Sequence, residues 1–318
     1  MKNFNSVGSS SDGKPTQKSN GISKIFKGAD EIKSLDLTSI DYLVDKLIPR
    51  GTLCAIVGES DTGKSSLLRQ LGVSIAYGDE NFLGFKLSGK CRNVLYVSTE
   101  DGEMGTSVWL NKHFGEDSVN NDFLSKLKFA FSTDNIVRNL KESVVRECID
   151  LIIVDSYADL FSGSMNNSNE VRAFLHQYAS IASEYGVTVI FLHHTKKSSA
   201  GHKPNKNNIL GSQGFEAKMR SVMMLTKDAK DSSLRHLCVV KNNYIDEANK
   251  NSSYVLKFNN HLSFENTGDR VILDELGEED YIGYARKLKE EGKTLREIEE
   301  KLREEGYEVS KSSLQRKI

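Results

Sequence analysis

The sequence predicts an α/β fold in which a mostly parallel, twisted sheet is flanked by helices. Runs of strand length alternate with amphipathic stretches. The clearest run, Leu151–Val154, is apolar throughout, as strands covered on both faces are, and Val187–Leu192 reads as a further buried strand. Several runs end in acidic or histidine residues, at the edge where open α/β sheets bind ligands. The 318 residues leave room for one such domain and a small extra module.

The first buried strand, Thr52–Val57, runs into a phosphate-binding loop of the pattern G-x-x-x-x-G-K-[ST]. Gly58 and Gly63 let the backbone turn tightly, Lys64 supplies a cation for the β- and γ-phosphates, and the Ser65 hydroxyl suits Mg²⁺. The helix that follows points its free N–H groups at the phosphates. The expected nucleotide-binding residues are Gly58, Glu59, Ser60, Asp61, Thr62, Gly63, Lys64, Ser65 and Ser66.

One residue of this loop is unusual, because Asp61 places an acid where the loop faces phosphate. We expect its side chain to point outward, since a carboxylate beside the phosphates weakens binding. The alternative interpretation of the whole motif is a solvent loop that happens to be rich in glycine.

Two further strands end in carboxylates. Asn93–Ser98 leads into Glu100, which can orient the water that attacks the γ-phosphate; the alternative is an acidic loop tip in solvent. Leu151–Val154 ends in Asp155, the expected second contact to Mg²⁺. ATP and Mg²⁺ are therefore the expected cofactors.

The strand Val187–Leu192 ends in adjacent imidazoles, His193 and His194. An imidazole at this strand end can sense the γ-phosphate. Zinc is disfavoured, because neighbours on a strand point to opposite faces of the sheet.

The polar stretch 196–208 is long for a loop within a compact domain, and such loops are usually functional or disordered. Its lysines can follow a nucleic-acid backbone; the alternative is a solvated loop. No aromatic residue is interleaved, so base stacking is not predicted there. The candidate contacts are Lys196, Lys197, Lys203 and Lys206.

Composition divides the chain into four parts: a disordered tail at 1–27, the α/β domain at 28–268, an acidic linker at 269–279 and a helix-turn-helix module at 280–318. The module has three helical stretches and a basic last helix, in which Lys311 and Arg316 are candidate DNA contacts. The alternative is a three-helix oligomerisation or partner module. Its expected core residues are Ile282, Ala285, Leu288, Leu295, Ile298, Leu302, Val309 and Leu314.

Composition also limits the class of protein. Hydrophobic residues make up 38%, no apolar run has the length of a membrane span, and no signal region is visible, which favours the cytoplasm. The four cysteines are scattered without a C-x-x-C pair, so we expect buried free thiols. Because the net charge is −1, nucleic-acid contacts must come from local basic patches.

Taken together, these strand ends resemble those of the RecA-like ATPases, most closely the plasmid replicative helicase RepA family of hexameric ATPases, over Ala29–Phe264. The resemblance implies that Glu100 is the catalytic glutamate and His194 the sensor. It also implies an arginine finger at Arg220, after Gly211-Ser212-Gln213, and a lysine at Lys241 that reaches a neighbour's nucleotide. The matching segments are the phosphate loop, Tyr96–Asp101, Val154–Ser156, Phe191–Thr195, Gly211–Arg220 and Lys241–Tyr244.

Three features depart from that family. Asp61 replaces a small residue, the last strand motif lacks an arginine, and the C-terminal helix-turn-helix is additional and resembles those of resolvase-type proteins. That addition shifts the prediction away from a pure unwinding motor.

The resemblance implies a DNA-dependent ATPase, a hexameric ring with ATP between neighbouring protomers and the 196–208 loop in a central channel. Such a protein would act as a helicase or DNA-remodelling motor of a plasmid, phage or other mobile element. The alternative is an ATP-switched DNA-binding regulator or loader that does not translocate. A third, less favoured interpretation is a kinase of the phosphate-loop class, for which no acceptor-substrate lid stands out.

Overall fold

The computed structural model describes residues 26–115, 121–196, 199, 203–229, 231–246, 249–273, 276, 280–304, 307 and 309–318. Within this part of the chain, no helix has the length and apolar character that crossing a membrane requires. The chain separates into two units at Ser39 and Ile40, and the first contains helix α1 (Ala29–Lys33).

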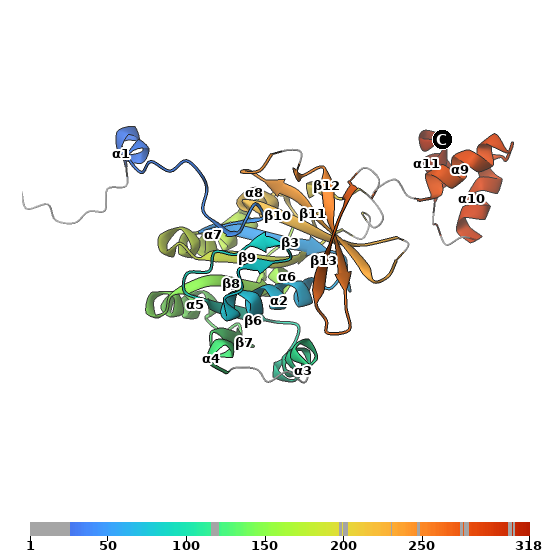
Figure 1. Cartoon of the computed structure of the whole chain (residues 1–318). Coiled ribbons are helices and arrows are strands. Elements are labelled where there is room, and N and C mark those ends of the chain that lie inside the picture. Colours follow the sequence, from blue (N-terminus) through green and yellow to red (C-terminus); the bar gives the residue numbers. More distant parts are fainter. Residues whose placement is uncertain are drawn as a thin grey trace, which may run out of the picture. The chain divides into compact units, whose positions relative to one another are not determined.

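A single nine-stranded sheet forms the centre of the second unit (Figure 1). The strands from β10 to β7 run parallel to one another, and β11, β12 and β13 extend the sheet with antiparallel pairing. The mostly parallel sheet that the sequence predicts is therefore confirmed. In spatial order the strands are β13 (Phe264–Ile272), β12 (Ser252–Phe258), β11 (Leu234–Asn242), β10 (Ser221–Lys227), β3 (Leu53–Gly58), β9 (Thr188–His194), β8 (Ile149–Asp155), β6 (Asn93–Ser98) and β7 (Leu127–Ala130).

Each face of the sheet is covered by its own apolar cluster. Alternate residues of β3 divide between them: Cys54 and Ile56 join the cluster that contains residues of α2, whereas Ala55 and Val57 join the cluster that contains residues of α5 and α7. This explains why the central strands are largely apolar on both faces. The helices are α2 (Lys64–Tyr77), α3 (Glu103–Phe114), α4 (Asn121–Leu124), α5 (Ile136–Arg146), α6 (Tyr157–Leu160), α7 (Ser168–Tyr185) and α8 (Gln213–Lys218).

Two short hairpins complete the domain. One pairs β1 (Tyr42–Val44) with β2 (Ile48–Pro49), in a stretch that reads as amphipathic in the sequence, and the other pairs β4 (Asn81–Phe82) with β5 (Phe85–Lys86).

In the sequence, Tyr254–Phe258 and His261–Phe264 look like the two strands of a closing hairpin, but the structure places the second strand later. His261 lies in the turn, because the Asn259 side chain accepts hydrogen bonds from the backbone N–H groups of His261 and Ser263 and fixes a tight loop. Strand β13 begins only at Phe264 and continues to Ile272, so the start of the predicted linker lies within the sheet.

The expectation that all four cysteines are free thiols is wrong for Cys91 and Cys148. Cys54 and Cys238 are free and buried, but Cys91 and Cys148 form a disulfide. Cys91 lies two residues before β6 and Cys148 directly before the neighbouring strand β8, and their Cα atoms are 5.4 Å apart. Their separation of 57 residues along the chain hides this proximity from the sequence.

Three C-terminal helices have a small core of their own, as the sequence predicts: α9 (Asp280–Glu290), α10 (Leu295–Glu304) and α11 (Lys311–Lys317). Thr294 and Glu297 cap α10 reciprocally, and the Ser310 hydroxyl accepts from the Ser313 N–H at the start of α11. The buried core residues are Ile282, Ala285, Leu288, Ile298, Leu302 and Leu314, with Leu295 and Val309 packed against them.

Candidate nucleotide-binding site

The phosphate loop joins β3 to α2 in the predicted place. Gly63 has a φ of 91°, and a Cβ added there would lie 2.8 Å from a ring carbon of Phe264, so glycine is required for both conformation and space. Helix α2 begins directly at Lys64, whose Nζ donates to the Glu59 carbonyl at 2.5 Å. The loop therefore curls around its own lysine.

The charged side chain of Lys64 is almost completely shielded from solvent. Its side chain is 5% exposed, and burial lowers the pKa of its ammonium group, while Glu100, Asp155 and Asp61 act in the opposite direction. The lysine thus lies among the acids that the sequence singles out. Asp61 itself is exposed, as expected, with a φ of 58° in the left-handed region that asparagine, aspartate and glycine tolerate best.

Asp155 ends β8 and is 1% exposed. Its Oδ2 accepts a 2.6 Å hydrogen bond from the Tyr96 hydroxyl, whereas its Oδ1 has no hydrogen-bond partner among the described residues. Burial raises the pKa of this carboxyl group, and the nearby hydroxyl groups of Tyr96 and Ser65 act in the opposite direction. A buried, unpartnered carboxylate oxygen beside a hydroxyl provides the hard oxygen ligands that Mg²⁺ prefers, so Ser65 and Asp155 fit this ion.

Glu100 follows β6 and His194 ends β9, so both residues lie at the carboxyl ends of the parallel strands. The Nε2 atom of His194 lies 3.8 Å from Oε1 of Glu100, and both side chains reach solvent. The structure therefore brings the predicted Lys64, Glu100, Asp155 and His194 together at the carboxyl ends of the parallel strands. In the described part of the chain, no three His, Cys, Asp or Glu side chains gather as metal ligands.

The adjacent imidazole has a different environment. His193 is fully buried, its Nε2 lies 3.0 Å from the Leu210 carbonyl, and burial lowers its pKa to about 4. It packs against the aromatic rings of Tyr157 and Phe215, so the two histidines point to opposite faces of β9, as the strand geometry predicts.

The predicted arginine finger, Arg220, and Lys241 lie near the amino ends of the parallel strands, at the edge of the sheet opposite the phosphate loop. The Arg220 N–H donates to the Leu53 carbonyl at the start of β3, and the Arg220 side chain is exposed beside a groove of about 730 Å³. Lys241 forms a 2.8 Å ion pair with Glu216 near the same edge. Strand β3 runs from this edge to Gly58, so about 16 Å of strand, at about 3.3 Å per residue, separates these cations from the phosphate loop of their own chain.

The predicted DNA contacts fall in two separate places. In the loop after β9, Lys196 donates to the Asn207 carbonyl, while Lys203 and Lys206, the first residue of a 3₁₀ segment, are exposed. Lys197 lies outside the described residues. In α11, Lys311 is exposed; Arg316 lies in the same helix, with a side chain outside the described part of the chain.

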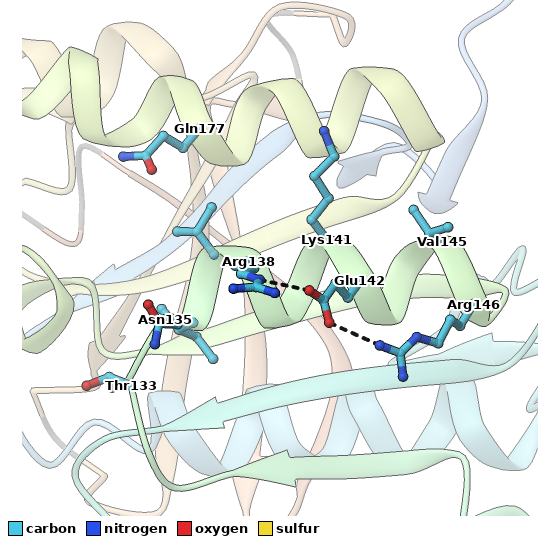
Figure 2. A pocket seen from close by; sticks show the side chains of 10 residues that line it. Thr133, Asn135, Arg138, Lys141, Glu142, Val145, Arg146 and Gln177 are labelled. Carbon is cyan, nitrogen blue, oxygen red and sulfur yellow. Dashed lines mark hydrogen bonds and ion pairs between the residues drawn. The ribbon is translucent and has the colours of Figure 1, made fainter.

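Another groove, of about 800 Å³, follows α5 and includes Gln177 of α7 (Figure 2). Three of its charged residues pair with one another, since Glu142 bridges Arg138 at 2.9 Å and Arg146 at 3.0 Å. None of the predicted site residues lines it.

Sequence reasoning missed three residues around the site. Arg69 lies over the ring of Tyr96, the partner of Asp155, and Asp101 and Trp109 in turn contact the Arg69 guanidinium. The available signals were a tyrosine in an otherwise aliphatic strand and an arginine within an apolar stretch of helix, since such buried polar groups need partners.

Comparison with known proteins identifies related folds. A family model described as an AAA domain matches residues 24–200, more than half of the chain. The solved ATPase domain of another protein superposes with a TM-score of 0.56 at 14% sequence identity, covering 74% of this chain and 95% of that chain. The RadB recombinase gives a TM-score of 0.49 at 18% identity, covering 69% of this chain and 91% of its own. No curated protein matches. The nine-stranded sheet and the likeness to the solved ATPase domain give the chain a RecA-like α/β fold.

Proposed function

Since this chain belongs to the AAA domain family, we propose that it hydrolyses ATP in a hexameric ring that acts on DNA. The observation that carries the proposal is the division of the predicted machinery between two edges of one sheet. Lys64, Asp155 and Glu100 meet at the carboxyl edge, whereas Arg220 lies near the opposite edge.

Each residue at the carboxyl edge has a chemical role. Lys64 and the N–H groups that begin α2 hold the phosphates. Ser65 and Asp155 would hold Mg²⁺, which when bound neutralises charge on the phosphate oxygens. The Glu100 carboxylate orients the attacking water by accepting its hydrogen bond, and His194, 3.8 Å away, responds to the γ-phosphate beside it.

A neighbouring protomer completes the pocket in this proposal. Arg220 would supply positive charge to the transition state from the next chain, with Lys241 beside it, because neither can reach the phosphate loop of its own chain. Head-to-tail contacts of this kind generate rings when the rotation closes.

DNA is the proposed polymer because lysines of the 196–208 loop follow β9, the strand that ends in the sensor candidate His194. Lys203 and Lys206 are exposed there and can contact phosphates. The motifs shared with the RepA family support replication or maintenance of a plasmid, phage or other mobile element as the setting.

ATPase activity measured without DNA, with single strands and with duplex tests this function. We expect stimulation by single strands that declines with salt, because phosphate contacts release counterions. The Lys64→Ala variant is the matched negative control. Equal turnover under all three conditions would contradict DNA dependence, and turnover by Lys64→Ala equal to that of the wild type would contradict the nucleotide site.

The second candidate function is an ATP-switched DNA-binding regulator, favoured by the separate core of α9, α10 and α11 and the capped, lysine-bearing α11. We propose residues 280–318 as a helix-turn-helix domain attached to an ATPase domain whose sheet continues to Ile272. Deleting the chain after Leu276 tests this assignment. We expect duplex affinity to fall while stimulation by single strands persists; retained duplex affinity would contradict the helix-turn-helix assignment.

A further inference from the structure

Behind the magnesium carboxylate lies a buried polar cluster that the chemistry above does not use. Its centre is Tyr96 of β6, which is fully buried and donates its hydroxyl proton to Oδ2 of Asp155 at 2.6 Å. Arg69 of α2 is 4% exposed, and its Cζ lies 5.7 Å from the centre of the Tyr96 ring. The same guanidinium donates at 2.7 Å to Asp101, the residue after Glu100.

These contacts join three elements of the site. Arg69 comes from the helix that begins at Lys64, Tyr96 comes from the strand that leads to Glu100, and Asp155 ends a third element, β8. Burying an arginine and an aspartate costs free energy unless they are paired and hydrogen-bonded. Hydrogen-bonded groups behind a metal-ligating carboxylate orient it, so a cluster in this place can serve positioning as well as packing.

We propose that Tyr96 and Arg69 are positioning residues for the magnesium site. The Tyr96 hydroxyl holds one oxygen of Asp155 and leaves the other, Oδ1, for the metal. Arg69 supports Tyr96 and ties the Glu100–Asp101 turn to α2, so that the metal carboxylate and the catalytic carboxylate are set together. This inference rests on the proposed nucleotide site.

The electrostatics agree with this arrangement. Desolvation raises the pKa of Tyr96, which keeps its hydroxyl protonated and able to donate. Burial raises the pKa of Asp155, and the Tyr96 hydrogen bond and the Arg69 charge both oppose that rise.

The Tyr96→Phe substitution removes the hydroxyl and keeps the ring. We expect the affinity for Mn²⁺, titrated in the presence of ADP and followed by electron paramagnetic resonance, to weaken about tenfold, as for other outer-shell partners of metal ligands. The affinity for a fluorescent ADP analogue in EDTA should stay unchanged, which shows that the fold and the phosphate loop are intact.

Tyr178→Phe is the matched control. Tyr178 is also fully buried, and its hydroxyl has no hydrogen-bond partner within the described chain, so its removal should leave Mn²⁺ affinity at the wild-type value. Unaltered Mn²⁺ affinity in Tyr96→Phe, in a protein whose wild type binds ADP and Mn²⁺, would overturn this inference alone. A wild type that binds no ADP would overturn the proposed function.

A double-mutant cycle tests the part played by Arg69. If Arg69 acts through Tyr96, then Arg69→Met and Tyr96→Phe combined should weaken Mn²⁺ binding about tenfold, as each does alone, instead of about a hundredfold. Additive losses would show that Arg69 acts independently and would overturn its assignment. Because Arg69→Met also removes the ion pair with Asp101, its ADP affinity in EDTA serves as the check of folding.

Discussion

The two ends of the parallel strands, here called the carboxyl edge and the amino edge of the sheet, differ in how their charged groups are paired. At the carboxyl edge, buried charges face one another: Lys64 is 5% exposed, Asp155 is 1% exposed, and Oδ1 of Asp155 has no partner in the described chain. At the amino edge, charges are satisfied. Asp150 accepts hydrogen bonds from Arg50 and from three successive backbone N–H groups, and a disulfide joins the residues before β6 and β8.

This contrast teaches that the charges of the amino edge are paired within the chain, whereas the carboxyl edge keeps a buried carboxylate oxygen without a partner in the described chain. Arg220 is the exception at the amino edge, since its side chain is exposed. Because Arg220 is exposed and lies far from the phosphate loop of its own chain, it is suited to contact the phosphate loop of a neighbouring chain.

Arg220→Ala tests this exception and should have the largest effect. We expect kcat to fall about 10³-fold or more, because a finger stabilises charge only in the transition state, while ATP affinity changes little. Steady-state ATPase assays and nucleotide binding measure the two quantities. Arg172→Ala removes another exposed arginine beside the same groove and should retain activity; equal losses in both variants would assign the effect to the surface instead of the finger.

Glu100→Gln tests the carboxyl edge itself. An amide cannot accept the proton of the attacking water, so we expect kcat to fall about 10²–10⁴-fold with nucleotide affinity preserved. Glu103→Gln, at an exposed position at the start of α3, is the control. Full activity in Glu100→Gln would move the catalytic base elsewhere.

The titration of His193 measures how completely water is excluded beneath the carboxyl edge. Burial lowers its pKa to about 4, so below about pH 6.5 the unfolded chain binds the proton more tightly than the folded chain. Its contribution to stability is present above about pH 6.5 and is lost as the pH falls toward 4. From pH 7 to pH 5 this residue alone should lower the free energy of unfolding by about 2 kcal/mol.

The His193→Gln variant keeps an N–H donor for the Leu210 carbonyl but does not titrate. Urea unfolding at pH 7 and pH 5 should therefore show a smaller loss in the variant than in the wild type, by about 2 kcal/mol. Identical losses of the free energy of unfolding in both proteins would mean that water reaches the His193 imidazole in the folded state.

Asp61→Asn should have the smallest effect. It removes a negative charge from the phosphate loop and keeps a residue that tolerates the φ of 58°. We expect ATP affinity to rise roughly fivefold, about 1 kcal/mol, with a smaller gain at high salt. Calorimetric titration measures this change, and weaker binding would show that Asp61 contributes to the site.

Much of the carboxyl edge could be predicted, because its chemistry is local. Lys64 and Ser65 belong to one loop, and Asp155 ends an apolar run, so strand polarity alone places them together. The C-terminal core followed from helical periodicity in the same way.

The rest depends on contacts between distant segments. Tyr96 looks like one more residue of a buried strand until Asp155, 59 residues away, is placed opposite it. Cys91 and Cys148 become neighbours only when β6 and β8 pair. The turn at Asn259 shifted the predicted strand because a side-chain hydrogen bond outweighed the local pattern.

A mixing experiment tests most directly whether two edges from two chains form one site. Arg220→Ala has an intact phosphate loop and Lys64→Ala an intact finger, and each variant alone should be inactive. Mixed protein should regain ATPase activity, because some interfaces pair a wild-type loop with a wild-type finger. Absence of recovery at every ratio, with mixed assembly verified, would contradict the shared pocket.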